Sequence, residues 1–184
     1  MNLLKQIPLT QTGEDFKIQF SDIKAGWLDV SITSGTINYT YCASYISDAP
    51  LELVETAIQM LRTQAEDKSA VLYHDLEGSM VTWYFAASGN NVAVFIWDNM
   101  YPDPFDNFID CNFESDCMEA LDENVDLRER LVLAFETTER QFAKAIVAAF
   151  SEIRKNYSLE EYAENWRNSN PEVQLKELQQ MLLT

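Results

Sequence analysis

The alternation of apolar and polar residues near the start of the chain constrains its fold most strongly. Apolar side chains occupy every second position in three successive runs, at residues 16–20, 28–32 and 37–43. A period of two gives each extended strand one apolar face and one polar face, and Ser34-Gly35 supplies a tight turn between the last two runs. These residues therefore predict an antiparallel meander whose sheet is covered on one side only.

A helix and a second set of strands are predicted next. Asp48 followed by Pro50 is typical of a helix start, and apolar residues then recur at helical spacing to about Gln64. Residues 71–97 predict three further strands separated by turns. The last of these, residues 92–97, is apolar on both faces, which is typical of a central or doubly covered strand.

The remaining residues predict mainly helices. Apolar spacing from about 125 to 157 indicates one long amphipathic helix, Ser158 and Glu161 form a capping box for a short helix, and Asn170-Pro171 begins another. The predicted order is βββα, βββα, αα, which is an α+β fold with an antiparallel sheet of about six strands and helices packed mainly on one face. The 184 residues suit a single domain, with an acidic and aromatic loop at about 98–124 and a helical C-terminal part at about 125–183.

Charge restricts the possible partners. The formal net charge is −17, and residues 69–127 contain twelve carboxylates but no lysine or arginine. Phosphate contacts require clustered Lys and Arg, so this balance argues against direct binding of nucleic acid or an anionic membrane. It favours a basic protein as partner, whereas an acidic surface that only confers solubility is the alternative. The sequence does not distinguish a monomer from a dimer.

The predicted partner surface is the segment at about 98–124, which breaks the regular periodicity. Its predicted partner-binding residues are Asp98, Tyr101, Asp103, Phe105, Asp106, Phe108, Asp110 and Phe113. Aromatic side chains are common interface anchors, and the surrounding carboxylates would steer a basic protein toward them. In the alternative interpretation, the aromatic rings pack onto the sheet and only the acids face outward.

Catalytic patterns are sparse. Five glycines form no phosphate-binding loop and no nucleophile elbow, and His74 is the only histidine, which excludes a histidine pair or a multi-histidine metal centre within one chain. Asp75 follows His74, but neighbours on a strand point to opposite faces. The acids from Asp98 to Asp110 do not match the EF-hand spacing. We therefore expect a protein that is not an enzyme and has no cofactor and no metal site, and an enzyme using carboxylates or a divalent metal is an alternative.

Cysteine spacing and the lengths of the apolar runs predict where the protein is located. The three cysteines show neither paired CxxC spacing nor an even number, which is typical of reduced thiols. The first nine residues are too short for a signal peptide, and no apolar run reaches the roughly 20 residues of a membrane helix. We expect a cytoplasmic protein.

Four segments of the chain stand out in its layout: residues 43–50 leading into a helix, strands at 81–85 and 92–97, and residues 162–166 before Asn170-Pro171. In these segments the chain resembles small acidic α+β bacterial proteins that act as immunity factors for polymorphic toxins. The resemblance implies inhibitor-like binding of a toxin domain, such as a basic nuclease, by a negatively charged face. The chain is also similar in size, acidity and α+β content to type III secretion chaperones, which act as adaptors, although those begin with a helix.

Overall fold

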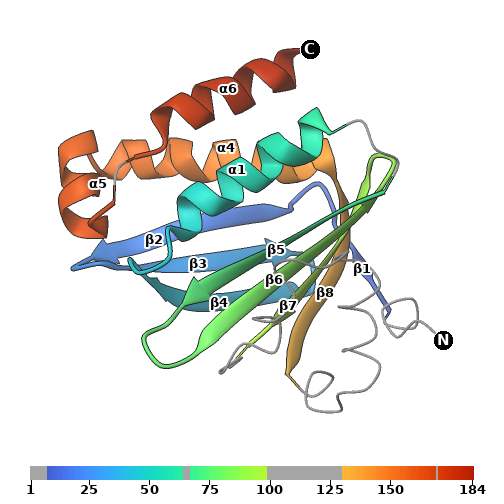
Figure 1. The fold of residues 1–184 in the computed structure, drawn as a ribbon, viewed down its shortest axis with the longest axis horizontal. Coiled ribbons are helices and arrows are strands. Elements are labelled where there is room, and N and C mark those ends of the chain that lie inside the picture. The colour runs from blue at the N-terminus through green and yellow to red at the C-terminus, as the bar shows by residue number, and fades with distance from the viewer. Residues whose placement is uncertain (1–7, 64–66, 99–129, 169) are drawn as a thin grey trace.

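A computed structural model describes residues 8–63, 67–98, 130–168 and 170–184, which form the α+β fold in Figure 1. The predicted fold class is confirmed. The prediction of a single antiparallel sheet of about six strands is wrong, because the described strands form a three-stranded and a five-stranded sheet.

The three-stranded sheet is the predicted meander. It consists of β2 (Lys17–Lys24), β3 (Trp27–Ser34) and β4 (Ile37–Ser44), paired antiparallel in the order of the sequence. Ile18 pairs with Ile32, and Val30 pairs with Tyr41. All four side chains are buried, so the alternation read from the sequence gives the correct inner face.

The five-stranded sheet joins distant parts of the chain. It consists of β1 (Thr10–Gln11), β5 (Asp67–Asp75), β6 (Met80–Ser88), β7 (Asn91–Trp97) and β8 (Leu131–Thr138). The strand order is β1-β8-β7-β6-β5. β1 runs parallel to β8 while the other neighbours are antiparallel, so the sheet is mixed.

Strand β8 corrects the predicted long helix and the predicted βββα order of the second half. Residues 131–138 are extended and pair with β7, and α4 (Glu139–Asn156) begins only afterwards. Thr138 marks the boundary, because its hydroxyl accepts a hydrogen bond from the Gln141 backbone N–H at 3.1 Å. Residues 125–129 of the predicted helix lie outside the described residues.

The helices gather mainly on one side of the two sheets, as Figure 1 shows. They are α1 (Ala49–Arg62), α4, α5 (Leu159–Trp166) and α6 (Glu172–Leu183). The predicted capping box of α5 is present between Ser158 and Glu161. No described helix is long and apolar enough to cross a membrane.

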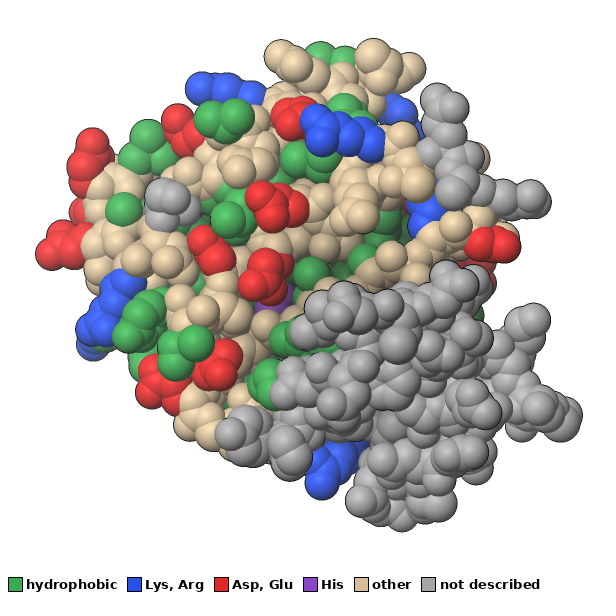
Figure 2. All heavy atoms as spheres, in the orientation of Figure 1, with side chains coloured by type: hydrophobic (Ala, Val, Ile, Leu, Met, Phe, Trp, Pro, Cys, Tyr) green, Lys and Arg blue, Asp and Glu red, His purple; other side chains and the backbone are tan. Residues whose placement is uncertain are grey.

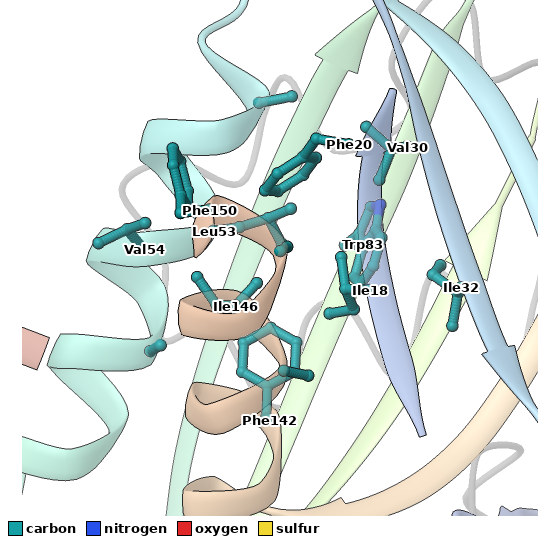
Figure 3. Close-up of a cluster of buried hydrophobic side chains, with 14 of the residues drawn as sticks. Ile18, Phe20, Val30, Ile32, Leu53, Val54, Trp83, Phe142, Ile146 and Phe150 are labelled. Carbon is teal, nitrogen blue, oxygen red and sulfur yellow. The ribbon is translucent and has the colours of Figure 1, made fainter. Parts of the chain in front are cut away.

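The main core lies between the helices and the apolar faces of both sheets (Figure 3). Phe142 and Ile146 of α4, Leu53 of α1, and Ile18 and Trp83 of the strands are all buried in it. Each such side chain contributes roughly 1.5–3 kcal/mol when buried. The core therefore fixes α1 against the sheets, which positions the polar groups at the beginning of that helix.

A smaller cluster lies on the other face of the five-stranded sheet. Tyr84 of β6 and Phe95 and Trp97 of β7 are buried there. Val94 and Ile96 of β7 belong to the main core. This confirms that residues 92–97 are covered on both faces.

Candidate functional site

Of the predicted partner-binding residues, Asp98 lies in the part of the chain that the structure describes. Tyr101, Asp103, Phe105, Asp106, Phe108, Asp110 and Phe113 lie outside the described residues. Asp98 directly follows β7, and its backbone N–H donates a hydrogen bond to the Arg130 carbonyl at 3.1 Å. Burial first, and then the nearby Asp98 carboxylate, raise the pKa of Tyr39. The surface formed by the acidic and aromatic residues remains a prediction.

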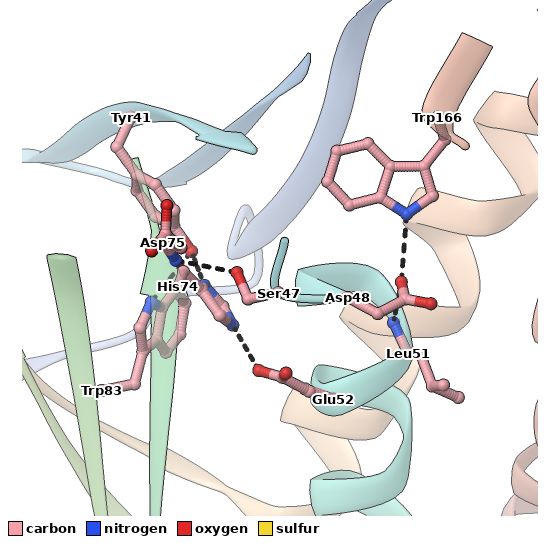
Figure 4. A network of polar contacts seen from close by, with 9 residues as sticks. All are labelled: Tyr41, Ser47, Asp48, Leu51, Glu52, His74, Asp75, Trp83 and Trp166. Carbon is pink, nitrogen blue, oxygen red and sulfur yellow. Dashed lines mark hydrogen bonds and ion pairs between the residues drawn. The ribbon is translucent and has the colours of Figure 1, made fainter. Parts of the chain in front are cut away.

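A different group of polar residues converges where α1 meets β4 and β5 (Figure 4). The Trp83 indole N–H donates to the Tyr41 hydroxyl oxygen at 3.0 Å, and the same hydroxyl is hydrogen-bonded to Nδ1 of His74. We assign the hydrogen of this hydroxyl to Nδ1, because in that tautomer the proton-bearing ring nitrogen faces the Glu52 carboxylate. In this assignment His74 is a neutral imidazole with its proton on Nε2.

The other ring nitrogen of His74 faces α1. Nε2 lies 3.5 Å from Oε2 of Glu52. That distance is long for a hydrogen bond, and Nε2 has no hydrogen-bond partner among the described residues. His74 is completely buried, and desolvation lowers its pKa to about 3. The imidazole therefore faces the Glu52 carboxylate as an uncharged donor.

Glu52 is the part of this network that reaches solvent, since its side chain is 32% exposed. Partial burial, followed by the charges of Asp48 and Glu55, raises its pKa to about 7. These residues are spaced four and three positions apart, which places them on one face of the helix. No lysine or arginine of the described residues lies within 4.0 Å of the three carboxylates. Figure 2 shows acidic side chains gathered over this end of α1.

Asp48 connects the network to α5. It is the N-cap residue of α1, and its Oδ1 accepts hydrogen bonds from the Trp166 indole N–H at 3.0 Å and the Leu51 N–H at 3.4 Å. Desolvation raises its pKa although these bonds oppose the change. The carboxylate is thereby held at the helix N-terminus, where the helix dipole favours its negative charge.

Asp75 plays a separate structural part. Its backbone N–H donates to the Ser47 hydroxyl at 2.8 Å, and the Ser44 hydroxyl donates to its Oδ1 at 3.2 Å. These bonds hold the end of β5 against the segment between β4 and α1. His74 and Asp75 thus have different partners, as expected for neighbours on a strand.

A buried ion pair lies at the other end of α1. Lys68 Nζ is 2.8 Å from Oε1 of Glu139 and donates to the Met60 carbonyl at 2.6 Å. Lys68 also lines a hollow of about 160 Å³ beside α1. Because the two charges neutralise each other, this place offers little attraction to an ion, in contrast to the acidic helix start.

The candidate site residues predicted from the sequence did not include Glu52. A signal was present, because the spacing of Asp48, Glu52 and Glu55 puts three acids on one face at a helix start. The approach of His74 was not visible, since it depends on how α1 packs against β5. Within the described residues, no three His, Cys, Asp or Glu side chains are grouped to hold a metal ion.

The carboxylates at the start of α1 give this surface a negative charge, which attracts cationic groups. The imidazole is too deeply buried to contact a solute, so its available role is to hold Glu52. Comparison with known proteins adds no relative: no protein-family model matches the chain, and no curated protein or solved structure is significantly similar to it.

Proposed function

We propose that this chain is a non-catalytic binding protein that neutralises or shields a basic protein partner, in the manner of an immunity protein that inhibits a toxin domain. The observation that carries the proposal is the group of three carboxylates at the start of α1, which has no lysine or arginine of the described residues within ion-pair distance. We name Asp48, Glu52 and Glu55 the α1 acidic group.

Electrostatics explains why such a group favours a cationic partner. Asp48 and Glu55 disfavour the charged form of Glu52, and this repulsion contributes to its raised pKa. A lysine or arginine placed between the carboxylates would replace the repulsion by attraction. The net charge of −17 would add a long-range field that accelerates the encounter with a basic protein.

Apolar contact area is available beside the α1 acidic group. Ile46 is 62% exposed and Tyr45 is 37% exposed, and both lie in the turn between β4 and α1. Arg167 lies over the Tyr45 ring in a cation–π contact, with its guanidinium carbon 4.9 Å from the ring centre. An apolar anchor surrounded by charge is a common composition for a binding surface. The predicted partner-binding residues after Asp98, up to Phe113, lie outside the described residues and remain a separate prediction.

The proposal is tested by capturing partners from a lysate of the source organism on the immobilised protein. Wild type is compared with Asp48→Asn/Glu52→Gln/Glu55→Gln, and bound proteins are eluted with a salt gradient. We expect one basic protein that is retained by wild type, elutes at moderate salt and is held less by the variant. Equal retention of the same proteins on both columns would contradict a role for this acidic surface.

A further inference from the structure

We propose that Glu52 is the contact residue for a lysine or arginine side chain of the basic partner, that His74 positions its carboxylate from the protein interior, and that binding at this place expels a proton. The inference rests on the proposed function and assigns it a residue and a chemical signature.

The first step is the geometry around Glu52. Its carboxylate has one side toward the interior, where Nε2 of His74 lies 3.5 Å away, and its side chain remains 32% exposed. Nε2 is buried and has no hydrogen-bond partner among the described residues. The Glu52 carboxylate therefore lies beside this buried nitrogen on its inner side and keeps lone pairs on its outer side for a ligand.

The second step is the hydrogen-bond direction, which excludes a cation beside the imidazole itself. With the Tyr41 hydrogen assigned to Nδ1, His74 carries its proton on Nε2, and its complete burial leaves no room for a cation beside the ring. A nitrogen that carries a proton repels cations and binds carboxylate oxygens. Any cationic group must therefore bind on the outer side of Glu52, between Asp48 and Glu55.

The third step concerns the charges that face Glu52 from each neighbouring element. Asp48 and Glu55 come from α1 and its cap, neutral His74 comes from β5, and the hydroxyl of Tyr41, whose pKa burial raises, comes from β4. None of these groups supplies a positive charge at neutral pH. A cation from the partner is the missing complement.

The fourth step is proton linkage. With a pKa of about 7, Glu52 is about half protonated at neutral pH in the free protein. A bound ammonium or guanidinium group favours the carboxylate, so binding shifts that pKa downward and releases about half a proton per complex at pH 7. Affinity consequently rises with pH across neutrality.

The test uses the full chain and a ten-residue lysine peptide, with its fully acetylated form as the uncharged probe. Isothermal titration calorimetry at pH 7 in two buffers of different ionisation enthalpy reports the protons released. We expect release with wild type, and we expect Glu52→Gln to abolish it and weaken peptide affinity about tenfold, as for loss of one charge-assisted hydrogen bond. Glu14→Gln is the matched control, because Glu14 is exposed and loses the same charge elsewhere.

His74 is tested as a positioning residue by a spectroscopic readout. The carboxyl carbon of Glu52 is followed by NMR during a pH titration. Removing the buried donor in His74→Phe should raise the pKa of Glu52, whereas His74→Gln retains an N–H donor and should preserve more of the wild-type titration. If His74 served only to stabilise the fold, the two variants would differ in overall stability, but the pKa of Glu52 would be the same in both.

The outcomes separate the two proposals. Wild-type protein that binds the lysine peptide no better than the acetylated peptide would overturn both. Charge-dependent binding that Glu52→Gln leaves unchanged, with no protons released, would overturn the assignment to Glu52 and leave the proposed binding function standing. Proton release that is lost in Glu52→Gln but kept in Glu14→Gln supports the inference.

Discussion

The Nε2 atom of buried His74 lies 3.5 Å from the Glu52 carboxylate, although the two residues belong to a strand and a helix that are separate in sequence. The contact joins an uncharged interior donor to an acid that reaches solvent. It also couples the α1 acidic group to the Tyr41 and Trp83 side chains behind it. Four of our predictions probe this network and its surroundings.

Glu52 should make stability depend on pH near neutrality. Its pKa in the folded protein, about 7, lies above the ordinary value of 4.5, so between these values the folded state binds more protons than the unfolded state. This stabilisation is complete below pH 4.5 and disappears as the pH rises through 7. We expect wild type to lose roughly 1 kcal/mol of unfolding free energy relative to Glu52→Gln between about pH 5 and 8, allowing for solvent screening. Urea denaturation of both proteins at several pH values measures this difference in unfolding free energy. A difference that does not change with pH would refute the prediction.

His74 should act in the opposite direction at lower pH. Its pKa in the folded protein, about 3, lies below the ordinary value of 6.5, so the unfolded state binds more protons in that window. The stabilisation is complete above pH 6.5 and disappears as the pH falls toward 3. From about pH 6.5 to 4, wild type should lose roughly 3 kcal/mol relative to His74→Gln. A difference between the two proteins that stays constant with pH would show that His74 is not held neutral by burial.

Tyr41→Phe should destabilise the fold without creating a large cavity. It removes the hydroxyl that accepts from Trp83 Nε1 and is hydrogen-bonded to His74 Nδ1, which leaves two buried groups without this partner. We expect a loss of about 1–3 kcal/mol in the free energy of unfolding. Tyr45→Phe is the control, since Tyr45 is 37% exposed and its change should stay within about 0.5 kcal/mol. Equal effects of the two changes would argue against the hydrogen-bonded chain.

Gly26 should be intolerant of a side chain. It has φ +86°, its N–H donates to the Asn165 carbonyl at 2.6 Å, and an added Cβ would lie 2.7 Å from Cδ1 of Tyr45. Gly35 also has a positive φ, but an added Cβ would meet no atom within 4 Å. Gly35→Ala should therefore cost only the backbone strain, about 1–2 kcal/mol, and Gly26→Ala should cost more. Thermal denaturation compares them, and a smaller loss for Gly26→Ala would contradict the close approach of Tyr45.

Local signals predicted the elements whose boundaries depend on neighbouring residues. The start of α1 is an example, because Asp48 accepts from the Leu51 N–H within the same turn and Pro50 suits that position. The capping box of α5 was likewise readable from Ser158 and Glu161. These interactions span three residues, so a sequence pattern contains all of their partners.

The errors arose where partners are distant in sequence. Residues 131–135 are apolar enough for a helix or a strand, and the choice depends on pairing with β7, in which Phe135 meets Val94. Glu136 and Glu139, which the long helix would have placed on one face, lie on β8 and at the start of α4, where Glu139 pairs with Lys68. The contact between Glu52 and His74 was unpredictable for the same reason, whereas the spacing of the three acids on α1 was readable.

The central claim is that negative charge drives binding of a basic protein, and it is tested most directly by association kinetics. The basic protein recovered by capture is purified and mixed with wild type, with Asp103→Asn/Asp106→Asn/Asp110→Asn and with Glu14→Gln in a stopped-flow instrument at several ionic strengths. Steering by charge predicts a wild-type association rate constant that falls steeply with added salt, and a slower, less salt-dependent rate for the triple variant. A wild-type rate that does not change with salt would contradict the account.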